Sequence, residues 1–299
     1  MPVTQAAASV RVVVEDADAE QYTEALAARF PAVRFIAIRS VEEMTSRLDE
    51  LRGCQVLITK GRSMQAGILA ELTGLRWVQS LIAGVDRFVA TLPPDRGILL
   101  TSTTGMHAPQ MAEMALTHLL VLARNVERLV LNKQRRAWER WNSLLLYKKT
   151  VAIVGLGTSG TEIGRLCKSL GMHVIGVSRT AGGRSSFDEV HGDEAISRVA
   201  ARADFLILTV AYHPQTAGLI DAAVLAAMKP TAFLVNIARG GIVDQDALVH
   251  ALQTGSIAGA GLDVFPVEPL PDSSPLWTMP NVFITPHMAG MSEYYVEQG

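Results

Sequence analysis

Three glycines at residues 155–160 carry the clearest chemical signal in this sequence. Gly155, Gly157 and Gly160 are spaced G-x-G-x-x-G and follow an apolar run at 151–154 that is typical of a buried strand. Apolar residues then recur at helical spacing as far as Gly171, which suits a helix end. The start of such a helix binds the pyrophosphate of a dinucleotide. We therefore assign this loop to cofactor binding, with a purely structural glycine turn as the alternative: Gly155, Leu156, Gly157, Thr158, Ser159 and Gly160.

The residues after the next expected strand, 173–177, bear on which dinucleotide is bound. NAD-binding units usually carry Asp or Glu about 20 residues beyond the glycines, where it binds the ribose 2′-hydroxyl. Here the residue 18 positions after Gly160 (178 − 160 = 18) is Ser178. Ser178, Arg179 and Thr180 offer two hydroxyls and a guanidinium, which suit a 2′-phosphate. We expect NADP(H) to be preferred and NAD(H) to be possible; the alternative is a solvated turn.

Polar residues also follow three of the later expected strands, and open α/β sheets bind ligands at such strand ends. Reduction of a 2-keto acid needs a cation to hold and polarise the acid and a proton donor for the alkoxide. Arg239 suits the first role and His287 the second, while Glu268 would favour the protonated imidazole. Taken singly, Arg239 could cap a strand end, His287 could be structural and Glu268 could be a solvated loop acid. Their joint occurrence at strand ends favours catalysis. We assign Ala238 and Asp263 to the cofactor site.

Length and composition indicate two domains without nucleic-acid or membrane features. The 299 residues exceed the usual size of one domain, and 49% are hydrophobic, which is enough for two cores. A net charge of −2 argues against nucleic acid and an anionic membrane surface as partners. Cys54 and Cys167 are the only cysteines, which fits a reducing compartment rather than a disulfide framework. No signal peptide is recognisable, so we expect a cytoplasmic location, and we predict no metal site.

The rest of the chain must supply the elements that position these residues. Before the glycine loop we expect strands at 10–14, 35–38, 56–58, 77–79 and 98–100, with helices near 19–29, 41–51 and 64–72. After it we expect strands at 205–209, 232–236, 257–262 and 282–285, with helices at 194–201, 222–228 and 245–253. This alternation indicates an α/β fold with parallel sheets. Between the two series, residues 109–141 are typical of one long helix that joins two domains or packs on a second subunit.

Five segments together resemble the D-isomer-specific 2-hydroxyacid dehydrogenases. They are IAGVD (82–86), GLGTSG (155–160), NIARGGIVDQDAL (236–248), GAGLDVFPVEPL (259–270) and TPHMAG (285–290). The last three are highly specific, and the resemblance covers nearly the whole chain. It implies that the catalytic residues are Arg239, Glu268 and His287. It further implies that the substrate carboxylate is bound by a loop formed by Ile82, Ala83 and Gly84.

The resemblance also implies the arrangement of the domains. Two Rossmann-like or flavodoxin-like domains with parallel sheets are expected, the nucleotide domain being inserted into the substrate domain. Residues 1–101, completed by 288–299, would form the substrate-binding domain. Residues 102–287 would form the dinucleotide-binding domain, including the long helix on which a homodimer is built. The chain ends at Gly299, whereas the family usually continues through a further helix that returns to the first domain.

These features predict an oxidoreductase that transfers a hydride from NADPH to a small 2-keto acid, giving the D-2-hydroxy acid. Glyoxylate and hydroxypyruvate are the first candidates, since the family's reductases of these acids also lack an acidic residue after the strand. Glu268 argues against the formate dehydrogenase-like branch, which carries Gln there. The alternatives are an NAD-linked D-lactate or 3-phosphoglycerate dehydrogenase, and a nucleotide-sensing binding protein similar to the family's corepressors.

Overall fold

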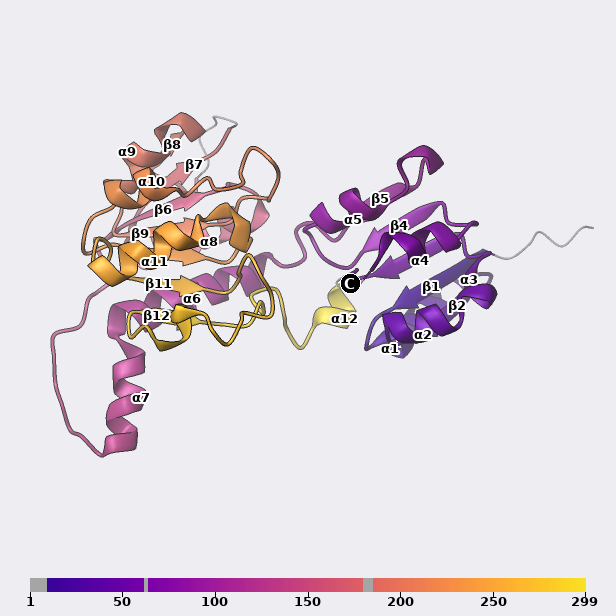
Figure 1. Ribbon diagram of the computed structural model, residues 1–299, viewed down its shortest axis with the longest axis horizontal. Coiled ribbons are helices and arrows are strands. Elements are labelled where there is room, and N and C mark those ends of the chain that lie inside the picture. Colours follow the sequence, from indigo (N-terminus) through magenta and orange to yellow (C-terminus); the bar gives the residue numbers. More distant parts are fainter. Residues whose placement is uncertain (1–9, 62–63, 180–184) are drawn as a thin grey trace, which may run out of the picture. The chain divides into compact units, whose positions relative to one another are not determined.

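The computed structural model describes residues 10–61, 64–179 and 185–299, which form two compact units (Figure 1). The smaller unit comprises Met1–Met106 and Glu293–Gly299, and the larger comprises His107–Ser292. The boundaries between the units lie after residues 106 and 292. Each is five residues beyond the boundary expected from the sequence (106 − 101 and 292 − 287). Each unit contains one parallel β-sheet.

The smaller unit has a five-stranded sheet in the order β2-β1-β3-β4-β5. Its strands are β1 (Arg11–Glu15), β2 (Arg34–Ile38), β3 (Val56–Thr59), β4 (Trp77–Ser80) and β5 (Leu99–Ser102). Its helices are α1 (Ala19–Arg29), α2 (Val41–Ser46), α3 (Leu48–Leu51), α4 (Ala66–Glu71), α5 (Asp86–Thr91) and α12 (Tyr295–Gln298), with a 3-10 turn η1 (Pro94–Arg96). Val13 of β1 packs against one apolar cluster, whereas Val12 and Val14 pack against another. Both faces of β1 are therefore buried, which explains its continuous apolar sequence.

The C-terminal helix α12 belongs to the smaller unit. Its buried Tyr295 donates a hydrogen bond from its hydroxyl to the carbonyl oxygen of Leu81, at 2.8 Å. The Lys60 ammonium lies 4.5 Å from the centre of the Tyr295 ring and pairs with buried Asp16 at 2.8 Å. These contacts attach the last residues of the chain to the end of β4, immediately before the loop at 82–84.

The larger unit has a seven-stranded sheet in the order β12-β11-β10-β9-β6-β7-β8. Its strands are β6 (Thr150–Val154), β7 (His173–Val177), β8 (Glu189–His191), β9 (Phe205–Leu208), β10 (Phe233–Asn236), β11 (Gly259–Leu262) and β12 (Val282–Ile284). Its helices are α6 (Ala108–Arg124), α7 (Val126–Arg135), α8 (Thr158–Ser169), α9 (Ile196–Ala200), α10 (Ala222–Ala227) and α11 (Gln245–Thr254), with 3-10 turns η2 (Asp193–Ala195), η3 (Gly240–Ile242) and η4 (Pro275–Thr278). Alternate residues of β6 pack on α6 and α8 and on the cluster that contains α9, α10 and α11, so helices cover both faces.

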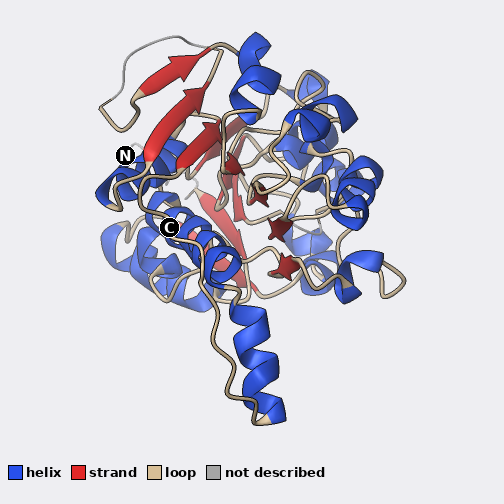
Figure 2. Ribbon diagram, turned by 90° about the vertical axis from the view of Figure 1, so that its left-hand side faces the viewer, coloured by secondary structure: helices blue, strands red, loops and turns tan. Residues whose placement is uncertain are grey.

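The prediction of a single long helix at 109–141 is wrong. The structure has two helices, α6 and α7, and α7 ends at Arg135. Asn125 separates them with a φ of 52°, and its N–H donates to the carbonyl oxygen of Leu122. Asparagine tolerates this left-handed conformation, which ends a helix even where apolar periodicity continues. Beyond Asn125, α7 extends away from the rest of this unit (Figures 1 and 2).

The other elements differ from expectation mainly at their ends. The helices expected at 41–51 and 194–201 are each divided, into α2 and α3 and into η2 and α9. The short edge strand β8 and the helix α12 were not predicted, because three or four residues are too few to show a period. In the part of the chain that the structure describes, no helix combines the length and hydrophobicity needed to cross a membrane.

Candidate active site

The three glycines of the G-x-G-x-x-G loop serve different physical purposes. Gly155 has a φ of 98°, and a Cβ there would lie 2.7 Å from the backbone nitrogen of Val210. A Cβ on Gly160 would lie only 2.0 Å from the carbonyl oxygen of Gly155. At Gly157, by contrast, nothing described lies within 4 Å of the Cβ position. The protein's own packing therefore requires Gly155 and Gly160, while Gly157 leaves open space beside the loop.

This open space lies at the start of α8. Gly157 is the N-cap residue of α8, and no side-chain cap is formed there among the described residues. The N–H groups of the first helical turn have no partner within a helix, and they carry partial positive charge. Gly157 and Thr158 are exposed and Ser159 is half-buried, whereas the Leu156 side chain is buried against Gly176. The loop thus fits a dinucleotide pyrophosphate through its backbone, and Leu156 can contribute only main-chain atoms.

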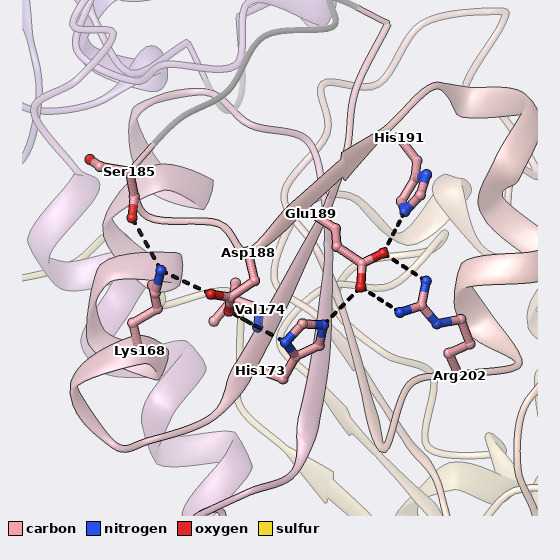
Figure 3. Close-up of polar contacts among 8 residues, drawn as sticks. All are labelled: Lys168, His173, Val174, Ser185, Asp188, Glu189, His191 and Arg202. Carbon is pink, nitrogen blue, oxygen red and sulfur yellow. Dashed lines mark hydrogen bonds and ion pairs between the residues drawn. The ribbon is translucent and has the colours of Figure 1, made fainter.

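The candidate 2′-phosphate residues follow β7 and are held by the edge strand β8. The Ser178 N–H donates to the carbonyl oxygen of His191 at 3.0 Å. The rings of His173 and His191 each place Nε2 3.0 Å from a carboxylate oxygen of Glu189, and Arg202 also pairs with that carboxylate (Figure 3). The Arg202 guanidinium, followed by the two histidines, holds the pKa of Glu189 well below its usual range. This network fastens β8 beside β7 and thereby fixes the backbone of Ser178.

Of the other two candidate phosphate residues, Arg179 is exposed to solvent, and Thr180 lies outside the described residues. The Glu189 network is not apparent from the sequence. Its members come from β7, β8 and the turn after α9, and the alternation of charged residues in Glu189–His191 is the one local signal that could have suggested it.

Glu268 and His287 form a direct pair. The Nδ1 atom of His287 lies 2.7 Å from Oε2 of Glu268, and both side chains are partly exposed. The other carboxylate oxygen, Oε1, accepts a hydrogen bond from the Phe265 N–H at 3.0 Å. Because an ionised carboxylate only accepts hydrogen bonds, Nδ1 carries the proton in this contact. The remaining ring atom, Nε2, is then available to exchange a proton with a ligand.

The backbone of His287 is left-handed, with a φ of 52°. Hydrogen bonds to Asp263 stabilise this conformation. The His287 N–H donates to the carbonyl oxygen of Asp263 at 2.8 Å. The buried Asp263 carboxylate accepts from Met288 N, Ala289 N and the Thr285 hydroxyl at 2.9, 3.0 and 2.6 Å. Such bonds on both sides of a residue can offset the roughly 1–2 kcal/mol cost of this conformation. Asp263 therefore shapes the His287 turn, and its contact with the cofactor remains a prediction.

Arg239 lies on a loop that Asn236 holds in place. The buried Asn236 amide accepts from the Ala238 N–H and donates to the Arg239 carbonyl oxygen, both at 3.0 Å. The next residue, Gly240, packs so closely that a Cβ would lie 1.9 Å from the carbonyl carbon of Phe265. The loop that carries Arg239 is thereby in direct contact with the loop that carries Glu268.

The third predicted loop, Ile82, Ala83 and Gly84, lies in the smaller unit after β4. The buried Ser80 hydroxyl accepts from the Ile82 N–H at 3.2 Å and donates to the Ile82 carbonyl oxygen at 2.9 Å. Ala83 is exposed and Gly84 half-buried. Because this loop and the Arg239, Glu268 and His287 set belong to different units, their joint action on one substrate remains a prediction.

Comparison with known proteins identifies the family. The sequence model described as "D-isomer specific 2-hydroxyacid dehydrogenase, NAD binding domain" matches residues 116–289. The chain belongs to this family. The matched residues include the glycine loop, Arg239 and the Glu268–His287 pair, and all of them lie in the larger unit.

Relatives and solved structures agree with this assignment. D-3-phosphoglycerate dehydrogenase of Methanocaldococcus jannaschii is 31% identical over 252 residues, covering 82% of this chain and 48% of that protein. The chain thus spans about half the length of this curated relative. A D-isomer specific 2-hydroxyacid dehydrogenase family protein from Aeromonas salmonicida is 31% identical with a TM-score of 0.87, covering 97% of this chain and 93% of the other.

A further solved structure is the NADPH-dependent glyoxylate/hydroxypyruvate reductase of Sinorhizobium meliloti, in complex with NADP and sulfate. It is 26% identical with a TM-score of 0.84, covering 97% of this chain and 92% of the other. The predicted family and the α/β fold with two parallel sheets are confirmed.

Two glycine variants separate cofactor binding from packing. Gly157→Ala should lower Tm only slightly, through the poorer N-cap that alanine makes, because its φ of −69° suits alanine and its Cβ meets no described atom within 4 Å. It should weaken NADPH binding about tenfold or more, since the new methyl group occupies the ligand side of the loop. Protein fluorescence titrated with NADPH measures the dissociation constant.

Gly160→Ala is the matched control. Its Cβ would lie 2.0 Å from the Gly155 carbonyl oxygen, so this variant should lose about 1–3 kcal/mol of unfolding free energy. Unchanged NADPH affinity in a folded Gly157→Ala protein would show that the pyrophosphate does not approach this loop.

Proposed function

We propose that this protein reduces a small 2-keto acid to the D-2-hydroxy acid with NADPH, glyoxylate and hydroxypyruvate being the first candidates. The observation that carries the proposal is the 2.7 Å contact between His287 and Glu268, on the sheet edge where β6 leads into the glycine loop. Strands of one parallel sheet bring their carboxyl ends to the same edge. A proton donor, a cation and a dinucleotide loop therefore follow strands of one sheet. Similarity to the Sinorhizobium meliloti reductase supports this choice of substrate.

Each residue has a chemical task in this proposal. NADPH, when bound, supplies the hydride. The Arg239 guanidinium binds the substrate carboxylate and polarises the keto group, and the N–H groups of Ala83 and Gly84 supply further donors to the carboxylate. The Nε2 atom of His287 gives its proton to the developing alkoxide. Glu268 orients the ring and stabilises the imidazolium until that transfer.

Cofactor selection is assigned to the residues after β7. Arg179 is exposed, so its guanidinium can meet a 2′-phosphate, and Ser178 is fixed by its hydrogen bond to His191. No acidic residue occupies 178–180 to accept a hydrogen bond from a ribose 2′-hydroxyl. These observations support NADPH over NADH. The similarity to D-3-phosphoglycerate dehydrogenase supports the second candidate, an NAD-linked enzyme of that type.

The proposal also assigns roles to the two units. The larger unit would bind the dinucleotide, since the NAD-binding family model lies wholly within it, and the smaller would bind substrate through 82–84.

A second copy of the chain would cover α7, whose Leu129, Val130 and Leu131 are exposed. Wild-type protein should then sediment at twice the chain mass, and Leu131→Asp should shift it toward the monomer. A monomeric wild type in analytical ultracentrifugation would remove the dimer from the proposal.

A panel of 2-keto acids assayed with each reduced cofactor tests both substrate and cofactor. We expect turnover of glyoxylate and hydroxypyruvate, with a higher kcat/KM for NADPH than for NADH. Arg179→Ala should lower kcat/KM for NADPH about tenfold to a hundredfold, because a charge-assisted phosphate contact contributes about 1.5–3 kcal/mol. Its activity with NADH should be nearly unchanged.

Arg198→Ala is the matched control, since Arg198 is an exposed arginine of α9 with the same charge. This variant should leave kcat/KM unchanged with both NADPH and NADH. Equal losses with NADPH and NADH in Arg179→Ala would show that this residue does not read the 2′-phosphate. Absence of turnover with every acid would favour the nucleotide-sensing binding protein instead.

The pH profile of Glu268→Gln tests the proton donor. For reduction, His287 must enter the cycle protonated, so kcat/KM should fall as pH rises and the ring loses its proton. Glutamine removes the negative charge that stabilises the imidazolium, so the fall should move to lower pH. At sufficiently acidic pH, much of the activity should return.

His287→Ala provides the comparison. It should be nearly inactive at every pH while still binding NADPH, because the pyrophosphate loop is a separate segment. A Glu268→Gln profile that keeps its midpoint and only drops in height would contradict the proposed pairing.

A further inference from the structure

A histidine outside the predicted set, His118 of α6, contacts the strand that leads to His287. His118 is fully buried, and its Nε2 lies 3.0 Å from the Thr285 hydroxyl oxygen. Its ring meets the Phe283 ring edge to face, with centres 5.0 Å apart. A Cβ on Gly261 would lie 2.4 Å from Nδ1 of His118, so this glycine leaves the room that the ring fills. The imidazole therefore joins α6 to β11 and β12 just before their carboxyl ends.

The hydrogen-bond directions around Thr285 follow from the donors available. The Thr285 hydroxyl has one hydrogen, and it donates that hydrogen to Oδ1 of Asp263 at 2.6 Å. The contact with His118 must then be a bond that Thr285 accepts, so Nε2 of His118 carries a hydrogen. Burial lowers the pKa of His118 to about 4, which keeps the ring neutral near pH 7. Neutral His118 is thus a fixed donor rather than a proton carrier.

The bond from His118 supports the orientation in which the Thr285 hydrogen points to Asp263. With Nε2–H directed at the hydroxyl oxygen, the hydroxyl hydrogen is directed to Asp263. The same carboxylate accepts from Met288 N and Ala289 N, on the far side of His287. Asp263 therefore links the two ends of the left-handed turn at His287, and its orientation depends on the Thr285 hydroxyl. A leucine would fill the space of His118 without supplying the donor.

We propose that His118 is a positioning residue for His287: its Nε2–H directs the Thr285 hydroxyl to Asp263, which holds the 285–289 segment and keeps the His287 ring against Glu268. This inference rests on the proposed function, because it concerns the proton donor of that reaction. A buried carboxylate whose two oxygens both have donors, as those of Asp263 do, specifies one local geometry, whereas one that lacks a donor does not. The proposed role of α6 is therefore to position the acid as well as to form part of the core.

Steady-state kinetics of two His118 variants test this role. His118→Leu should lower kcat for keto-acid reduction about tenfold to a hundredfold, the range expected when a reacting group is displaced by about 1 Å. KM and the NADPH dissociation constant should change less than about twofold, because the variant leaves Arg239 and the glycine loop untouched. His118→Gln, whose amide nitrogen can replace Nε2–H as the donor, should recover most of kcat.

Thr285→Val tests the next bond of the chain. It should lower kcat about as much as His118→Leu does. The kcat of the double variant should be no lower than that of the less active single variant, since both substitutions break one chain of hydrogen bonds. Additive losses would mean that the two residues act separately. If His118→Leu does not fold, His118→Gln and Thr285→Val decide the question.

Nitrogen-15 NMR of the histidine rings supplies a readout that does not need turnover. The wild type should show the His287 Nδ1–H bonded to Glu268, and His118→Leu should shift or broaden that signal while His118→Gln restores it. Folded His118→Leu with wild-type kcat and an unchanged His287 signal would overturn the proposal, as would His118→Gln being as impaired as His118→Leu. If the wild type reduces no keto acid, the proposed function fails, and the NMR response alone decides whether His118 positions His287.

Discussion

The geometry of the candidate site depends on one buried carboxylate, that of Asp263. A buried charge must be met by hydrogen bonds, because an unmet one costs several kcal/mol. Asp263 satisfies this requirement with the Thr285 hydroxyl and the N–H groups of Met288 and Ala289. The donors it needs are the donors of the turn that carries His287. The same hydrogen bonds therefore satisfy the carboxylate and shape the turn, in which His287 has a φ of 52°.

Close backbone packing at glycines shapes the other loops of the larger unit. Gly240 lets the Arg239 loop lie directly on the backbone at Phe265, and Gly261 makes room for the His118 ring. Gly155 and Gly160 pack equally closely in the dinucleotide loop. At each of these positions a side chain would overlap a neighbouring atom, so glycine is required by contact as well as by conformation. The carboxyl ends of several strands can thereby carry functional groups next to one another.

The same side chain serves different purposes in different surroundings. His287 is partly exposed and pairs with the Glu268 carboxylate, which suits the proposed role of proton donor. His118 is fully buried against Phe283 and Thr285, where burial lowers its pKa and leaves it a neutral donor. His173 and His191 lie at the sheet edge, where they join Arg202 around Glu189 and fasten a strand. Environment, more than residue type, decides which of these histidines suits catalysis.

The sequence alone predicted most of the features that depend on local order. Apolar periodicity indicated most strands and helices, and the glycine spacing indicated the dinucleotide loop, because both patterns arise from neighbours along the chain. The same reasoning failed at Asn125, where apolar periodicity continued through a left-handed residue. Only the tertiary structure brought His118 to Thr285, 167 residues away, and Glu189 to Arg202. Only it showed that Asp263 shapes the His287 turn, because a carboxylate's donors are decided by which segments fold around it and not by the residues beside it in sequence.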